Sequence, residues 1–350
     1  MTFLTPKAQA LTPYTAGIQP KEPGWVKLNT NENPYPPSSK AAEAIRGANL
    51  DALRLYPDSD SNILCEVIAG RYGVALENVF CGNGSDEVLA LAYQAFFAER
   101  DNILTPDISY AFYPVWAQMY GVTAKIIPLK EDFSIDPGEY VNSNGVILAN
   151  PNAPTSRALT LAQVETIVRN NPHAVVLIDE AYIDFAGVAS AVSLVPKYEN
   201  LLVVQTFSKS YSLAGLRVGF AVGSRALVDG LQKIKHSFNS YPLGMLEQKA
   251  ATAAMLDTDY WNETRQKVKA TRDKTIGALR ELGYAVQDSH TNFILMKAKD
   301  EGHAKGLYEH LLAHKILARY WQKPRISEFL RVSVGTDEEM EAFLQCVKQF

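Results

Sequence analysis

Three short runs of continuous apolar residues constrain the fold of this chain more than any other feature. They cover residues 145–150 (GVILAN), 174–180 (AVVLIDE) and 201–207 (LLVVQTF), and turn residues or charges bound each run. Strands that are apolar on both faces are typical of a parallel sheet covered by helices on both sides. An amphipathic helix is predicted near residues 85–98, directly after the short run at 78–81. This alternation of strands and helices predicts an α/β fold with a doubly wound, mostly parallel sheet.

The character of the sequence changes along the chain, and these changes predict three parts. Residues 1–45 begin with a stretch rich in Pro, Asn and Thr, and we expect them to form an arm that packs against a small domain. Residues 46–260 carry the strand–helix alternation and should form the large domain. Residues 261–350 are predicted to form a smaller α/β domain, whose last helix begins with a capping box made by Thr336 and Glu339.

Charge and composition exclude several classes of protein. The net charge of −4 among 350 residues gives no basic footprint for nucleic acid. No apolar run approaches the roughly 20 residues that span a bilayer, and the N-terminus lacks the features of a signal peptide. Three cysteines far apart in the sequence are typical of reduced thiols, so we expect a cytoplasmic protein.

Polar residues gather where the predicted strands end. In a parallel sheet, ligands bind beyond the carboxyl ends of the strands. The strand ends carry GNGSDE (82–87), NPNAPTS (150–156), DEAY (179–182) and SKS (208–210). A glycine-rich turn, asparagines, an acid with a tyrosine and a lysine with hydroxyls are therefore expected to meet at one edge of the sheet.

The glycine-rich turn leads into the predicted helix and offers an anion site. Gly84 permits a tight turn, and the backbone N–H groups of Ser85 and Asp86 are free at the helix start. A helix start capped by Ser85 is the plainer alternative. The turn matches neither the dinucleotide-binding fingerprint nor the P-loop.

A buried acid and a lysine follow the next strands. Asp179 comes after five apolar residues, where a carboxylate is costly unless it meets a cation. It either forms a salt bridge or holds a protonated ring nitrogen, with Tyr182 nearby as a hydrogen-bond donor. Lys209 suits a Schiff-base lysine, because it stands at a strand end beside an anion site. The expected phosphate ligands around it are Thr206, Ser208 and Arg217.

These segments resemble a known family. SKSYSLAGLRVG (208–219) is similar to the lysine segment of fold-type-I pyridoxal-phosphate aminotransferases, and the strand-end motifs follow that family's order. Four further segments resemble its histidinol-phosphate aminotransferase branch: LTPYTAG (11–17), KLNTNENPYPP (27–37), RLYPD (54–58) and LRVSVGT (330–336). The resemblance therefore covers nearly the whole chain and implies a large cofactor-binding domain with a smaller α/β domain.

The resemblance implies roles for the cofactor residues. Lys209 would bind pyridoxal phosphate covalently and then move the substrate proton, while Asp179 would keep the pyridine nitrogen protonated. Tyr182 would donate to the phenolate oxygen, and Tyr110 would stack on the ring. Ala153 stands where the family has an asparagine, so Asn152 is the expected substitute. The residues implied around the cofactor phosphate are Gly84, Ser85, Thr206, Ser208 and Arg217, with Tyr56 reaching it from the partner subunit of a homodimer. Asp86 is a further expected cofactor-binding residue.

The resemblance also implies the substrates, L-histidinol phosphate and glutamate or 2-oxoglutarate. Arg331 lies off the apolar face of its predicted strand and is the expected clamp for their carboxylate or phosphate. The weaker candidates for substrate binding are Arg319, Tyr14 and Asn33. The alternatives are an aromatic-amino-acid aminotransferase, a phosphothreonine decarboxylase and, outside the enzymes, a regulatory module that binds the cofactor.

One pair of residues could be mistaken for a metal site. His310 and His314 lie four apart on a predicted helix, but they fall off its apolar stripe and no glutamate lies between them as in the H-E-x-x-H motif. We therefore expect them to lie in solvent, and we expect no metal site.

Overall fold

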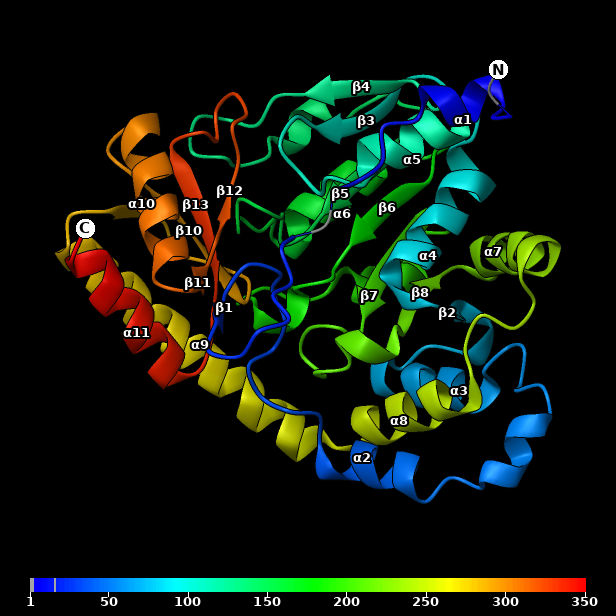
Figure 1. Ribbon diagram of the computed structural model, residues 1–350. Helices are drawn as coiled ribbons and strands as arrows, with labels where there is room; N and C mark the ends of the chain where they lie inside the picture. Colours follow the sequence, from blue (N-terminus) through cyan, green and yellow to red (C-terminus); the bar gives the residue numbers. More distant parts are fainter. Residues whose placement is uncertain (1–2, 16) are drawn as a thin grey trace.

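A seven-stranded sheet forms the centre of the large domain (Figure 1) in the computed structural model, which describes residues 3–15 and 17–350. The strand order is β2-β8-β7-β6-β5-β3-β4. Only β8 runs antiparallel to its neighbours, so the prediction of a mostly parallel sheet is confirmed. The strands are β2 (Val79–Gly82), β3 (Ile103–Pro106), β4 (Ala124–Ile127), β5 (Gly145–Ala149), β6 (Val176–Asp179), β7 (Leu201–Thr206) and β8 (Gly219–Gly223).

Helices cover both faces of this sheet, as the continuous apolar runs predict. In β5, Ile147 packs on one face of the sheet, whereas Val146 and Leu148 pack on the other. The first face is covered by α4 (Gly84–Ala92), α5 (Tyr113–Tyr120) and α7 (Arg225–Phe238). The second face is covered by α3 (Asn62–Tyr72), α6 (Leu161–Arg169) and α8 (Met245–Leu256). The doubly wound architecture is therefore confirmed.

A second, smaller sheet of order β12-β13-β10-β9 has its own apolar core. Its strands are β9 (Ala285–Val286), β10 (Phe293–Lys297), β12 (Arg319–Tyr320) and β13 (Phe329–Ser333), and its helices are α9 (Thr258–Glu281), α10 (Glu301–Ala313) and α11 (Asp337–Lys348). The predicted capping box is present at α11. The Thr336 N–H donates to Glu339 Oε2 at 2.8 Å, and the Glu339 N–H donates to Thr336 Oγ1 at 3.2 Å.

The N-terminal arm contacts both the large domain and the small domain. Its first helix, α1 (Pro6–Ala10), lies near α5, where the Gln118 side chain donates to the Ala10 carbonyl at 2.7 Å. Further on, β1 (Val26–Lys27) pairs in parallel with β11 (Ile316–Leu317) of the small domain, and α2 (Ser39–Arg46) packs against α8. The domain boundaries at residues 45 and 260 stay predictions. Among the residues that the structure describes, no helix has the length and apolar composition needed to cross a bilayer.

Candidate active site

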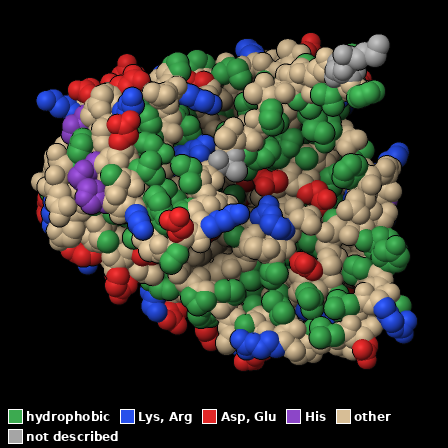
Figure 2. Space-filling view, viewed as in Figure 1, with side chains coloured by type: hydrophobic (Ala, Val, Ile, Leu, Met, Phe, Trp, Pro, Cys, Tyr) green, Lys and Arg blue, Asp and Glu red, His purple; other side chains and the backbone are tan. Residues whose placement is uncertain are grey.

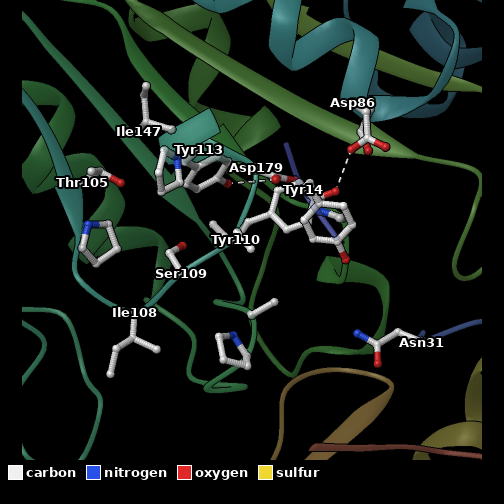
Figure 3. Close-up of a pocket in the computed structure, with 18 of the residues that line it drawn as sticks. Tyr14, Asn31, Asp86, Thr105, Ile108, Ser109, Tyr110, Tyr113, Ile147 and Asp179 are labelled. Carbon is white, nitrogen blue, oxygen red and sulfur yellow. Dashed lines mark hydrogen bonds between the residues drawn. The ribbon is translucent and has the colours of Figure 1, made fainter. Parts of the chain in front are cut away.

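A cavity of about 1020 Å³ opens beyond the carboxyl ends of the large sheet's strands. Its walls come from the N-terminal arm, from the ends of β3, β6 and β7, from α5 and from the small-domain strands β12 and β13. Figure 3 draws Asp86, Tyr110, Tyr113 and Asp179 from the large domain and, from the arm, Tyr14 and Asn31, which is set apart at the lower right. Segments far apart in the sequence thus form one cavity, as the strand-end motifs predict.

Asp179 is a buried acid at the end of β6. Its carboxylate accepts hydrogen bonds from the Tyr113 hydroxyl at 2.9 Å and from the Ala181 N–H at 3.1 Å. Burial raises the pKa of Asp179 from its ordinary value to about 6. It forms no ion pair with any described residue, although a buried carboxylate needs a cation. Because Asp179 lines the cavity, its carboxylate is suited to bind a protonated ring nitrogen of a ligand.

Lys209 also reaches the cavity. Its ammonium donates to the Thr30 carbonyl at 3.3 Å and lies 5.6 Å from the centre of the Tyr182 ring. The Tyr182 hydroxyl accepts a hydrogen bond from the Asn31 side chain at 3.0 Å. No acid within the described chain forms an ion pair with Lys209, so its amine is available for chemistry with a ligand.

The predicted anion site lies where α4 begins. Arg217 Nη1 donates to Ser208 Oγ at 3.2 Å, and Ser85, Thr206 and Ser208 line the cavity with it. Gly84 has a φ of +78°, and a Cβ there would lie 2.5 Å from Arg217 Nη2. The first N–H groups of α4 and the guanidinium therefore converge on one point, which is the geometry of a phosphate site.

A glycine that the sequence reasoning missed permits this convergence. Gly219 is the register partner of both Thr206 and Gly82, so it holds the glycine-rich turn beside β7. A Cβ at Gly219 would lie 2.3 Å from the Ser85 nitrogen, so only glycine fits. The sequence contained a hint of this role, because Gly219 is the last residue of the motif SKSYSLAGLRVG.

Asp86 contacts both Tyr110 and Arg217. It accepts a hydrogen bond from the Tyr110 hydroxyl at 2.8 Å and forms an ion pair with Arg217 at 3.2 Å. Burial, followed by the charge of Asp86, raises the pKa of Tyr110 well above its ordinary range. The Tyr110 ring is therefore neutral and fixed at the cavity wall, available to stack on a planar ligand.

Two arginines form the small-domain wall. Arg331 on β13 and Arg319 on β12 are register partners, and neither forms an ion pair within the described chain. Arg331 Nη2 donates to the Asn29 carbonyl at 2.6 Å, but its Nε is buried without a partner. Burial lowers the pKa of Arg331. Trp321 lies 5.5 Å from its guanidinium, and Tyr14 lines the same cavity. These arginines can bind an anionic ligand.

Of the predicted residues that have a side chain, three do not line this cavity, and neither does Gly84. The Asn152 amide is hydrogen-bonded to Ser109, the Ile108 carbonyl and Thr155, so its role in place of the asparagine lost at Ala153 stays a prediction. The Asn33 amide donates to the Lys209 carbonyl at 3.1 Å, so it supports the lysine segment, and its predicted contact with the substrate stays a prediction. Asn31, two positions earlier in the same motif, lines the cavity instead.

Tyr56 is the third. It is 81% exposed and stacks on Tyr241, with ring centres 4.6 Å apart. It does not line the cavity of its own chain, so its predicted role stays a prediction that needs a second copy of the chain.

The fold is that of known aminotransferases. The histidinol-phosphate aminotransferase of Sinorhizobium meliloti, solved in complex with pyridoxal-5'-phosphate, is 23% identical, and the match has a TM-score of 0.87 and covers 100% of this chain and 98% of that one. The aspartate aminotransferase of Thermus thermophilus, solved with maleate, is 18% identical and matches with a TM-score of 0.84 over the full length of both chains.

Comparison of sequences finds relatives with higher identity than these solved structures. The histidinol-phosphate aminotransferase of Brachyspira hyodysenteriae is 49% identical over 348 residues, which cover 99% of this chain and 98% of the relative. The enzyme of the same name from Acinetobacter baumannii strain SDF is 50% identical over 354 residues, which cover 100% of this chain and 97% of the relative. The family signature of aminotransferase class I and II matches residues 23–347. The chain belongs to the aminotransferase class I and II family.

Proposed function

We propose that this chain is a pyridoxal-phosphate-dependent aminotransferase that transfers an amino group between L-histidinol phosphate and 2-oxoglutarate. One observation carries the proposal: a single cavity holds Lys209, Asp179, Arg319 and Arg331, and none of these four forms an ion pair with another described residue. The names of the full-length relatives that are about 50% identical support the choice of substrate.

The residues present fit the cofactor. The N–H groups at the start of α4, with Ser208 and Arg217, would hold its phosphate, and Asp179 would bind its protonated ring nitrogen. Asp179 has no cation partner among the described residues. A protonated ring nitrogen would supply one and so stabilise the charged carboxylate. Bound in this way, the cofactor supplies an electron sink for negative charge at the substrate α-carbon.

The chain's own residues then act on the substrate. Lys209 would hold the cofactor, and its free amine would remove and return the proton at the substrate α-carbon. Tyr182 is held by Asn31 with its hydroxyl toward the cavity, where it can donate to the cofactor's phenolate oxygen. Arg331 and Arg319 would bind the phosphate of histidinol phosphate and a carboxylate of the dicarboxylic acid in turn.

An exposed apolar surface supports a homodimer. Residues 50–63 and Tyr241 expose large apolar side chains that a monomer rarely leaves uncovered, and Figure 2 shows hydrophobic side chains on this lower right part of the molecule. They are Leu50 (66%), Leu53 (52%), Leu55 (59%), Tyr56 (81%), Ile63 (70%) and Tyr241 (44%). Pairing through this surface would bring Tyr56 to the partner's phosphate site. The three free cysteines support a reducing compartment such as the cytoplasm.

A substrate panel tests the proposal. The purified holoenzyme is assayed with L-histidinol phosphate, with L-tyrosine and with O-phosphothreonine, in each case with 2-oxoglutarate as acceptor. We expect the highest kcat/KM for histidinol phosphate and formation of glutamate in equal amount. Absence of histidinol phosphate turnover, or preference for either other compound, would overturn the assignment.

A further inference from the structure

Two helices of the small domain place three side chains that favour soft metal ions beside one another. His310 lies on α10, His314 caps the C-terminus of that helix, and Cys346 lies on the neighbouring helix α11. One potential ligand atom of each residue lies within 4.8 Å of the other two. Both helices are at the left edge of the molecule in Figure 1, where histidine side chains gather in Figure 2.

The prediction that both histidines lie in solvent is wrong for His310. His314 is exposed, but His310 is half-buried, and its Nε2 is buried without a hydrogen-bond partner in the described chain. The Phe350 ring packs against His310, with ring centres 5.3 Å apart, and excludes water from this side. A buried polar atom with no partner destabilises the fold, so this nitrogen points to a missing ligand.

The hydrogen bonding of His314 leaves one of its nitrogens free for a metal. His314 Nδ1 lies 2.9 Å from the backbone oxygen of His310. Because a carbonyl oxygen can only accept, Nδ1 carries the hydrogen and Nε2 keeps its lone pair. Histidines that bind metals commonly donate their other N–H to a backbone carbonyl, which fixes the ring orientation.

Cys346 supplies the third group. It is a free thiol that is only 5% exposed, and its helix packs against α10. None of the three residues lines the catalytic cavity, so the aminotransferase chemistry does not account for their arrangement.

We propose that His310, His314 and Cys346 bind one Zn²⁺ ion that links α11 to α10. Two imidazole nitrogens and a thiolate, with water in the fourth position, are a donor set that zinc accepts, whereas Mg²⁺ and Ca²⁺ prefer oxygen. The Cys346 thiol releases its proton to solvent on binding. The three atoms lie within 4.8 Å of one another, and zinc–ligand distances of about 2.0–2.3 Å require them to draw together by about 1 Å.

Calorimetric titration of the holoenzyme with Zn²⁺, after treatment with a chelator and desalting, tests the site. We expect about one equivalent of Zn²⁺ to bind per chain, and His314→Ala to weaken binding at least about 100-fold, because it removes a direct ligand. His314 is exposed, so this variant should fold normally. The matched control is His173→Ala, an exposed histidine outside the cluster, which should bind zinc as the wild type does.

X-ray absorption of the zinc-loaded protein identifies the ligands. We expect one sulfur neighbour in the wild type and none in Cys346→Ser. The proposal is overturned if the wild type binds no zinc, if His314→Ala binds it as tightly as the wild type, or if no sulfur neighbour is found. Aminotransferase rates should be unchanged in His314→Ala, so failure of the zinc site and failure of the proposed reaction are separate results.

Discussion

The Tyr113 hydroxyl donates a hydrogen bond of 2.9 Å to the Asp179 carboxylate, at the inner end of the cavity. Burial raises the pKa of Asp179 to about 6, although this bond and the Ala181 N–H act to lower it. Asp179 is therefore an acid that the fold alone does not stabilise as an anion. It becomes an effective anion when a cation occupies the cavity.

This imbalance predicts how the stability of the cofactor-free protein changes with pH. Between about pH 4 and pH 6 the folded chain keeps a proton on Asp179 that the unfolded chain has lost, so this group makes stability fall as pH rises. The shift from 3.8 to about 6 corresponds to at most about 3 kcal/mol. Asp179→Asn cannot ionise, so it should match the wild type near pH 4 and exceed its stability by up to that amount above pH 7.

Urea unfolding of both cofactor-free proteins across this pH range measures the difference. Asp229→Asn, at an exposed position on α7 outside the cavity, is the matched control for replacing a carboxylate by an amide. An Asp179→Asn variant less stable than the wild type at pH 8 would contradict the description of this site.

Gly219→Ala should damage the phosphate site. A Cβ at this position would lie 2.3 Å from the Ser85 nitrogen, so α4 must move away from β8. Overpacking of this kind costs about 1–3 kcal/mol of stability, and the displaced N–H groups should weaken cofactor binding at least about tenfold. Gly215→Ala is the matched control, because a Cβ there meets nothing within 4 Å. Cofactor titration followed by absorbance measures both variants, and equal affinities would show that the close contact has no role.

Arg331→Gln should weaken the binding of both substrates. Hydrogen bonds to charged groups contribute about 1.5–3 kcal/mol, so KM should rise roughly 10–100-fold for histidinol phosphate and for glutamate. Arg225→Gln on α7, an exposed arginine outside the cavity, should leave both KM values unchanged. Steady-state kinetics decide the matter, and an effect of Arg331→Gln on neither substrate would reassign this arginine to structure.

Mixing two inactive variants tests the shared active site. Lys209→Ala lacks the amine, and Tyr56→Ala should lack most activity because it removes a phosphate contact to the partner chain. If chains exchange at random in a twofold dimer, about a quarter of the sites regain both residues, so activity should return to about a quarter of the wild-type value. No recovery after exchange, or a fully active Tyr56→Ala, would exclude the proposed contribution of Tyr56.

The parallel sheet could be predicted from the sequence because its strands are apolar on both faces. A run such as 201–207 is typical of a strand buried in the centre of such a sheet. The residues that follow strands were also predictable, since Asp179 and Lys209 are placed by the direction of the strands themselves. Asn33 and Asn31 were harder to separate. Both belong to one extended segment, and only the side-chain directions show that Asn33 faces the lysine backbone while Asn31 faces the cavity.

Other features depend on contacts between distant segments. Tyr113 lies on a helix that carries no motif, so nothing in the sequence connected it with Asp179. Cys346 and His310 lie 36 positions apart (346 − 310), and their proximity follows from how α11 packs on α10. Packing between helices decides such pairs, and periodicity within one helix cannot reveal them.

Reduction of the holoenzyme with borohydride, followed by digestion and mass spectrometry, tests the central claim most directly. If Lys209 binds pyridoxal phosphate covalently, the reduced cofactor should be found on the peptide that contains Lys209. A cofactor-saturated protein in which that peptide stays unlabelled, or in which another lysine carries the label, would contradict the assignment of this cavity.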